Sequence, residues 1–349
     1  MTIADVLLSI LWLALFIYTI FGGADFGAGM LELFAVGESG SRQEALIDES
    51  IGPVWESNHV WLIFLLVVFF TAFPPAFAAI NVVLFIPLLL AVIGIVLRGS
   101  SFVFKTHGSI QRNRNVRILS RTFSVASIMT PFFLALSAAA IASGVIVIQN
   151  TSQIVTNTGS DWLTPFTLTI GAMALALCVT ISAIYLTVEA TAKGETELAE
   201  AFRRRGLIAG ALTAALGLLG LILSPSEAAF LWHGMLDKAI PLVILTMLVG
   251  VAAAATLWFR RYGWARALIV AEAALLLLSW GVSQYPYIIP PDVTAANASS
   301  PQETQQFLLV GIIIALIIVV PSLWYLFYVF KLKKVTTGAG DVAQKPAEE

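Results

Sequence analysis

The chain has 349 residues, of which 59% are hydrophobic and 11% charged, with a formal net charge of −2 and a mean hydropathy of +0.91. A soluble domain carries roughly 25% charged residues, so this composition excludes a soluble protein and identifies an integral membrane protein. The apolar runs are long and unbroken, which excludes a pore-forming β-barrel and predicts an all-α polytopic membrane protein. The single cysteine, Cys178, lies in an apolar run and is expected to be a small core residue.

Nine apolar segments are long enough, or nearly so, to cross a bilayer as helices of about 20 residues. The first begins with "MTIADVLLSILWLALFIY", which lacks a positively charged start and a small-residue cleavage site, so we expect a retained helix rather than a signal peptide. Pro74 and Pro75 separate the second and third segments and predict a tight hairpin there. The segments cover residues 5–34, 52–72, 76–98, 121–147, 162–189, 206–223, 239–259, 265–285 and 306–330.

Lysine and arginine gather in alternate connections, which indicates the orientation of the chain. The opposite connections hold one lysine, Lys238, and no arginine. This asymmetry predicts an N-terminus outside and a C-terminus in the cytoplasm, with one membrane domain over residues 1–334 and a disordered cytoplasmic tail over 335–349. The basic stretches are residues 98–121, 203–205, 260–266 and 331–334.

Two carboxylates fall inside these segments, where an ionisable side chain is costly and is a functional candidate by default. Asp25, in "FGGADFGAGML", lies roughly 13 Å from the inner end of the first segment, and Glu56, in "IGPVWESNHVWLI", lies roughly 7 Å into the second. A short loop joins the two segments, so we expect both side chains to contribute to a proton path from the cytoplasm. The alternatives are a polar staple, in which a protonated Asp25 bonds a neighbouring backbone, and an interfacial Glu56 that only reaches water.

His59 follows Glu56 by one helical turn, within reach of a hydrogen bond. The sequence has three histidines and no His/Cys/Asp cluster at metal-binding spacing, so we expect no metal site and favour His59 as a partner of Glu56 over a haem ligand. Trp61 is either a packing aromatic or a residue with a more specific role. Snorkelling at inner helix ends is the favoured explanation for three other charged residues, Arg98, Glu189 and Glu272.

The residues alone leave two functions open, a proton-coupled secondary transporter and a cofactor-free subunit of a larger redox complex. Transporters built from repeats have broken helices at matching places in their two halves. The glycine-rich region around Asp25 and the Pro74–Pro75 pair have no counterpart in the second half, which favours the subunit. Membrane topology explains the basic stretch 98–121, so no nucleic-acid partner is expected.

Together, "GGADFGAGML" and "IGPVWESNHVWLI" resemble subunit II of the cytochrome bd-type quinol oxidases, and "LRGSSFVF" and "YPYIIP" extend the resemblance over nearly the whole chain. The resemblance implies nine helices, arranged as two four-helix bundles plus one peripheral helix, beside a related subunit I that carries the haems, haem b and haem d. It implies no redox cofactor on this chain, and it allows a structural quinone and small single-helix accessory subunits. The complex would oxidise quinol and reduce dioxygen to water in a bacterial or archaeal plasma membrane, taking protons from the cytoplasm without pumping.

The resemblance also implies roles for single residues. The family's acidic residue in the first-helix motif matches Asp25, and the acid after the motif tryptophan matches Glu56; both are implicated in proton delivery. Trp61 matches a tryptophan associated with the oxygen route. Relatives commonly have Asp at the position of Glu56, and many lack a histidine at the position of His59, so no family role passes to His59.

Overall fold

The computed structural model describes residues 2–35, 39–51, 55–107, 114–144, 146 and 162–327. These residues are helical apart from connecting turns and one short antiparallel strand pair, which confirms the all-α class. The predicted tail at 335–349 lies outside the described residues. The elements in chain order are α1 (Ile3–Glu32), α2 (Gly40–Ile51), α3 (Trp55–Ala72), α4 (Pro74–Val83), α5 (Phe85–His107), α6 (Arg114–Ser143), α7 (Pro165–Ala192), α8 (Thr196–Glu227), α9 (Ala229–Gly234), the π-helix η1 (Met235–Ala239), α10 (Ile240–Trp258), α11 (Tyr262–Gln284), β1 (Tyr287–Ile289), β2 (Val293–Thr294) and α12 (Gln302–Phe327).

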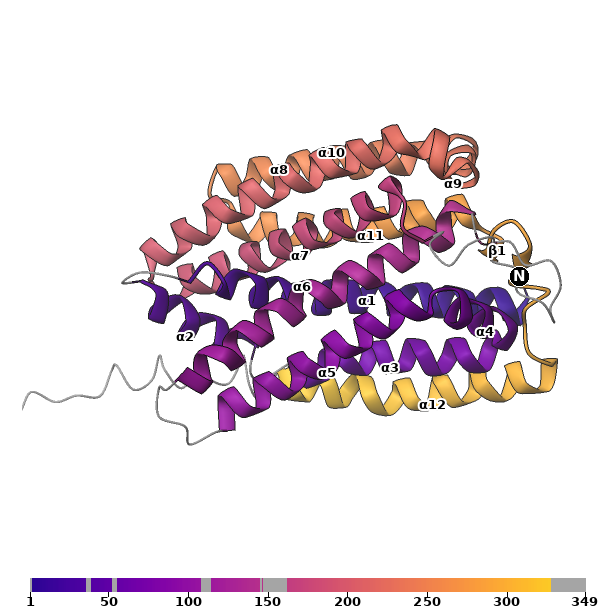
Figure 1. The fold of residues 1–349 in the computed structure, drawn as a ribbon, viewed down its shortest axis with the longest axis horizontal. Coiled ribbons are helices and arrows are strands. Elements are labelled where there is room, and N and C mark those ends of the chain that lie inside the picture. The colour runs from indigo at the N-terminus through magenta and orange to yellow at the C-terminus, as the bar shows by residue number, and fades with distance from the viewer. Residues whose placement is uncertain are drawn as a thin grey trace, which may run out of the picture.

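The long helices run along one common axis of the molecule (Figure 1). The N-terminus, α4, α9 and β1 gather at one end, called here the α9 end, and α2 lies at the opposite end, called the α2 end (Figure 1). Helix α12 packs on α1 and α3. Eight described helices are long and apolar enough to cross a membrane, and the number is nine if one bent pair counts as a span. The chain is therefore a multi-pass membrane protein.

The bent pair consists of α3 and α4, and it differs from the predicted hairpin. Pro74 and Pro75 are the first residues of α4, where a missing backbone N–H costs no hydrogen bond. The two helices are bent by 116°. Residues 76–83 therefore belong to a separate short helix, and the third predicted span begins at Phe85 instead of residue 76.

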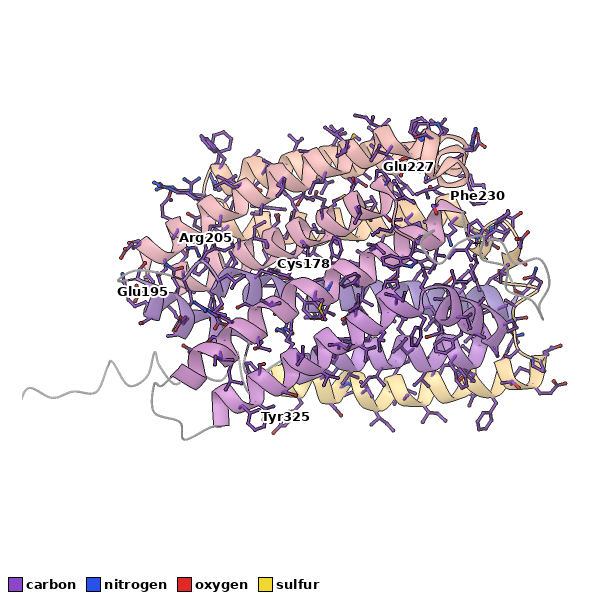
Figure 2. All side chains as sticks on the ribbon, viewed as in Figure 1. Cys178, Glu195, Arg205, Glu227, Phe230 and Tyr325 are labelled. Atoms are coloured by element: carbon purple, nitrogen blue, oxygen red, sulfur yellow. The ribbon has the colours of Figure 1, made fainter. Side chains whose placement is uncertain are left out.

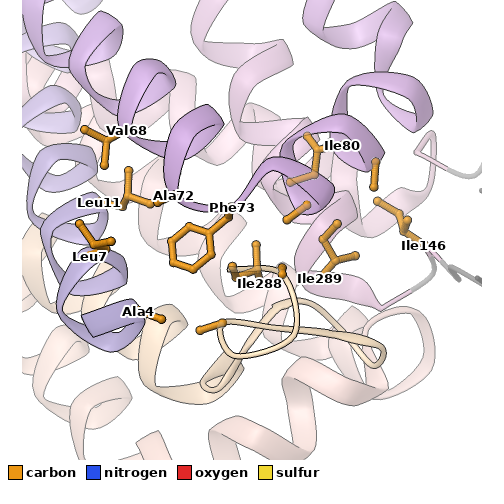
Figure 3. Close-up of a cluster of buried hydrophobic side chains, with 14 of the residues drawn as sticks. Ala4, Leu7, Leu11, Val68, Ala72, Phe73, Ile80, Ile146, Ile288 and Ile289 are labelled. Carbon is orange, nitrogen blue, oxygen red and sulfur yellow. The ribbon is translucent and has the colours of Figure 1, made fainter. Parts of the chain in front are cut away.

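A large buried hydrophobic cluster closes the α9 end (Figure 3). Phe73, fully buried, lies between the end of α3 and the β1 region, with Leu7 of α1 on one side of its ring and Ile288 of β1 on the other (Figure 3). The backbone N–H of Ser300 donates to the carbonyl of Ala72 at 2.8 Å. The connection between α11 and α12 thus folds back over the end of α3 and fixes this helix relative to α1.

Two glycines bring α1 into the centre of the protein. A Cβ added at Gly27 would overlap the backbone carbonyl of Cys178 in α7, and one added at Gly29 would overlap the Ser127 side chain in α6. Small residues permit this close approach of transmembrane helices. The glycine-rich motif of the first segment therefore places the turn that carries Asp25 against two other helices.

Candidate functional site

Asp25 and Arg98 form a buried ion pair between α1 and α5. Arg98 Nη2 lies 2.7 Å from Asp25 Oδ1, and the two side chains are 1% and 2% exposed, respectively. The same nitrogen donates to the backbone carbonyl of Asp25 at 3.2 Å, and Arg98 Nε donates to Ser127 Oγ at 3.0 Å. Opposite charges removed from water require such pairing and additional hydrogen bonds. The site therefore joins α1, α5 and α6 at one point.

Two aromatic rings cover the guanidinium of Arg98. Its central carbon lies 4.9 Å from the ring centroid of Phe26 and 4.6 Å from that of Phe123, distances at which a cation is attracted by the ring face. The prediction that Arg98 snorkels at a helix end is wrong. Helix α5 continues to His107, so Arg98 lies inside the helix and not at the start of a basic loop.

Two buried polar atoms close to this pair make no hydrogen bond within the described part of the chain, namely Asp25 Oδ2 and the hydroxyl of Tyr18. Tyr18 precedes Asp25 by two turns of α1. Its ring packs beside Gly22, where an added Cβ would lie 3.1 Å from a ring carbon. The glycine therefore leaves space for the tyrosine ring along the face of α1 that leads to Asp25.

The sequence predicted Asp25 as a site residue but missed Arg98, Ser127 and Tyr18. The available signal for Arg98 was its position in the apolar run of "AVIGIVLRGSSFVF", because one buried charge requires another. Ser127 and Tyr18 carry no comparable signal, since hydroxyl side chains are common in transmembrane helices.

Helix α3, which carries the other predicted site residues, packs against α1. The side chain of Glu56 lies outside the described residues, so its proximity to Asp25 stays a prediction. The His59 and Phe26 rings lie 6.2 Å apart at an interplanar angle of 73°. His59 therefore contacts the ring that also covers Arg98, which places it near the ion pair.

Trp61 packs at the edge of a buried cluster that contains Tyr18, Phe26 and Cys178. Its ring lies 6.2 Å from that of Phe64 on the same helix, and its side chain is half-buried. Cys178 lies near the middle of the molecule (Figure 2) and is buried, as predicted for a core residue. The oxygen-route role of Trp61 stays a prediction.

The described histidines lie on separate elements. His233 is in α9, and its Nδ1 hydrogen-bonds the carbonyl of Ala229 in the same helix at 2.7 Å, whereas His59 is in α3. Among the described residues, no group of three or more His, Cys, Asp and Glu side chains could hold a metal ion.

Charged contacts surround α2 at the end of the molecule where Glu195 and Arg205 lie (Figure 2). The hydrogen bond to Glu197, followed by the charge of that residue, raises the pKa of the Arg42 guanidinium above its usual value. These contacts hold α2 against the α7–α8 connection and the first turns of α8. They join Arg42 to Glu195 (3.2 Å) and to Glu197, Lys193 to Glu49 (2.6 Å), and Arg205 to Gln43 (2.9 Å).

Residues 3–330 match the family described as cytochrome bd terminal oxidase subunit II. A Bacillus subtilis protein named "Putative cytochrome bd menaquinol oxidase subunit II" is 23% identical over 95% of this chain and 97% of its own. A second Bacillus subtilis protein, named "Cytochrome bd ubiquinol oxidase subunit 2", is 23% identical over 88% of this chain and 90% of its own.

Among solved structures, the bd oxidase from Geobacillus thermodenitrificans contains a chain with the same fold. The TM-score is 0.79 at 26% sequence identity, and the match covers 95% of this chain and 99% of the other. On these grounds the chain belongs to the cytochrome bd terminal oxidase subunit II family.

Proposed function

We propose that this chain is the haem-free subunit II of a terminal oxidase that oxidises quinol and reduces dioxygen to water. Its partner would be a subunit I that holds haem b and haem d. Family membership and the match to a bd oxidase structure support this assignment. The names of the two Bacillus subtilis relatives share quinol as the electron donor, and we assign the same class of donor here.

Within this complex, we propose that Glu56 and Asp25 deliver protons from the cytoplasmic side, with His59 beside them. The geometry of Asp25 carries this proposal. Arg98 holds Oδ1, while Oδ2 is buried and has no hydrogen-bond partner in the described part of the chain. A buried carboxylate oxygen in this state is ordinarily hydrated, and it can accept a proton through a water molecule. Arg98 would compensate the negative charge of Asp25 between successive transfers.

Tyr18 would extend the path beyond Asp25. Its hydroxyl, like Asp25 Oδ2, is buried and makes no hydrogen bond within the described part of the chain, and a phenol can donate and accept hydrogen bonds at the same time. Seven residues of helix place it roughly 10 Å farther from the α2 end than Asp25. The proposed order of proton transfer is Glu56, then Asp25, then Tyr18, toward the partner subunit.

The remaining parts of the proposal concern topology. The α2 end would face the cytoplasm, because the basic stretches 203–205 and 260–266 are on that side of the helices that carry them. The family arrangement of nine spans would count α3 and α4 as one bent span. The first bundle would then comprise α1, α3, α5 and α6, the second α7, α8, α10 and α11, and α12 would be peripheral. The weak burial of α12, 6% of its most apolar window, supports its peripheral place.

The two functions left open by the sequence can be distinguished by purification. The tagged chain is isolated from its native membrane in mild detergent, and a visible absorption spectrum and quinol-dependent oxygen uptake are recorded. We expect a second large polypeptide, haem b and haem d bands, and oxygen uptake. A colourless chain that stays folded alone would favour the proton-coupled transporter.

A further inference from the structure

Glu272 lies at the middle of a membrane-spanning helix. In the sequence it is well separated from Asp25 and Arg98, the residues of the ion pair. Helix α11 spans Tyr262–Gln284, which places Glu272 roughly 15 Å from its first residue and 18 Å from its last. Snorkelling to a helix end, the sequence-based expectation for Glu272, does not account for this depth. An acid at the centre of a bilayer is rare and marks a functional site by default.

The carboxylate of Glu272 lies against the backbone of Gly250 at the middle of α10. A Cβ at Gly250 would lie 2.8 Å from Glu272 Oε1 and 3.4 Å from Oε2. The glycine therefore makes a notch in α10 that the whole carboxyl group enters. The next residue of α10, Val251, is 69% exposed, so the outer surface of α10 beside the notch is apolar.

No cation neutralises this carboxylate within the described part of the chain. No hydrogen bond or ion pair joins Glu272 to another described residue, and the sequence of α10 contains no ionisable residue. Arg266, on the same helix as Glu272, stacks over the ring of Tyr185, with its guanidinium carbon 5.9 Å from the ring centroid. Arg98 is committed to Asp25. The charged form of Glu272 would thus stand alone in an apolar layer, at a large cost in solvation free energy.

We propose that Glu272 and the Gly250 notch form a second proton-binding site, in which a neutral carboxyl group in the middle of the membrane is open to small lipid-soluble reagents. The site is separate from Asp25 and rests on the membrane location of α10 and α11, not on the proposed proton path. Its ligand is the proton, and its characteristic reagent is a hydrophobic carbodiimide.

The chemistry with such a reagent requires the acid form. The carboxyl proton moves to one carbodiimide nitrogen, and the carboxyl oxygen bonds the central carbon to give an O-acylisourea. Transfer of the acyl group to the neighbouring nitrogen then yields a stable N-acylurea, so every atom of both reactants stays in the product. The reagent reaches the group through the membrane, whereas a water-soluble carbodiimide does not.

The test treats the whole oxidase complex in its native membrane with dicyclohexylcarbodiimide and locates adducts by peptide mass spectrometry. We expect an adduct on Glu272, no adduct at that position in Glu272→Gln, and an unchanged adduct in Asp25→Asn. The matched control is Glu189→Gln on α7, near the α2 end of that helix, which leaves the Glu272 adduct in place. An unmodified Glu272 in the intact complex, or equal labelling by a water-soluble carbodiimide, would overturn the proposal.

Infrared spectroscopy provides a second readout that does not depend on reagent access. The wild-type spectrum minus that of Glu272→Gln is expected to contain the C=O stretching band of a protonated carboxylic acid, which shifts in D₂O. Gly250→Ala keeps the acid but crowds it, so its band is expected to shift in frequency without disappearing. A difference spectrum with carboxylate bands in place of the acid band would show that Glu272 is charged and contradict the proposal.

Discussion

Arg98 donates two hydrogen bonds to Asp25, one to the Asp25 carboxylate at 2.7 Å and one to the Asp25 backbone carbonyl at 3.2 Å. The second contact matters because it fixes the guanidinium relative to the backbone of α1 and not only to a rotatable side chain. Ser127 accepts a hydrogen bond from the same guanidinium. The pair thus links three helices. It also leaves one carboxylate oxygen, Asp25 Oδ2, as the proposed proton acceptor.

A double-mutant cycle separates these two roles of the ion pair. Asp25→Asn or Arg98→Gln alone leaves one uncompensated buried charge, which typically destabilises a protein by about 3–5 kcal/mol. The double variant Asp25→Asn/Arg98→Gln removes both charges, and we expect it to recover most of the assembled complex while oxygen uptake stays low. Yield and thermal unfolding midpoint report assembly, and oxygen uptake per haem reports proton delivery. Recovery of both assembly and uptake in the double variant would show that the pair is only a structural link.

Glu56 is expected to act as a proton carrier at the cytoplasmic mouth of the path. Glu56→Gln keeps its size and removes its proton chemistry, so we expect oxygen uptake to fall by at least tenfold, since general acid–base groups typically contribute about 10²–10⁴-fold. Glu56→Asp keeps the carboxyl group, and we expect it to retain most of the uptake. The comparison is made by oximetry with a short-chain quinol. Equal rates in the Gln and Asp variants would mean that the carboxyl group has no role.

Tyr18→Phe removes a buried hydroxyl that has no hydrogen-bond partner among the described residues. Since no protein hydrogen bond is lost, we expect the unfolding midpoint of the complex to change little. We expect oxygen uptake to fall several-fold, because the proposed path loses its step beyond Asp25. The matched control is Tyr185→Phe on α7, whose ring lies against Arg266. A rate equal to wild type in Tyr18→Phe, with both variants assembled, would remove Tyr18 from the path.

Gly27 permits the contact between α1 and α7, and replacing it tests the packing around the site. Gly27→Ala would force a Cβ onto the Cys178 carbonyl, and overpacking of this kind typically destabilises by about 1–3 kcal/mol. We expect a lower unfolding midpoint and less assembled complex. Gly311→Ala in α12 is the control, because a Cβ there meets nothing within 4 Å. If both variants unfold at the same temperature, the close approach of α1 and α7 is not a requirement for stability.

The sequence was informative where one residue or one segment determines the outcome. Asp25 stood out because a single acid in an apolar run is conspicuous, and the membrane class followed from composition. The pairing of Asp25 with Arg98 was not predictable in the same way, since 73 positions separate them and only the packing of α1 on α5 and α6 brings them together. The end of α5 was also placed too early, at residue 98, because Arg98 was counted with the basic stretch 98–121, although the helix continues to His107.

At the α9 end, the predictions of a hairpin at Pro74–Pro75 and of a non-helical connection between α8 and α10 were wrong, because packing between distant segments determines the structure there. Pro74 and Pro75 terminate one helix, but they also begin another well, and only the cluster around Phe73 decides which outcome occurs. The connection expected between α8 and α10 is likewise helical, as α9 and η1. In both places tertiary packing at the end of the bundle, and not local sequence, determines the structure.

The most direct test of the account is proton uptake by the Asp25→Asn oxidase. The purified complex is reconstituted into vesicles, and uptake from the side of the α2 end is followed with a pH indicator during quinol oxidation, beside the wild type and at matched haem content. We predict that Asp25→Asn slows proton uptake and oxygen reduction together, by at least tenfold, while the haem spectrum is unchanged. Wild-type rates of both processes in Asp25→Asn would contradict a proton path through this residue and leave the Asp25–Arg98 pair as a structural link between α1 and α5.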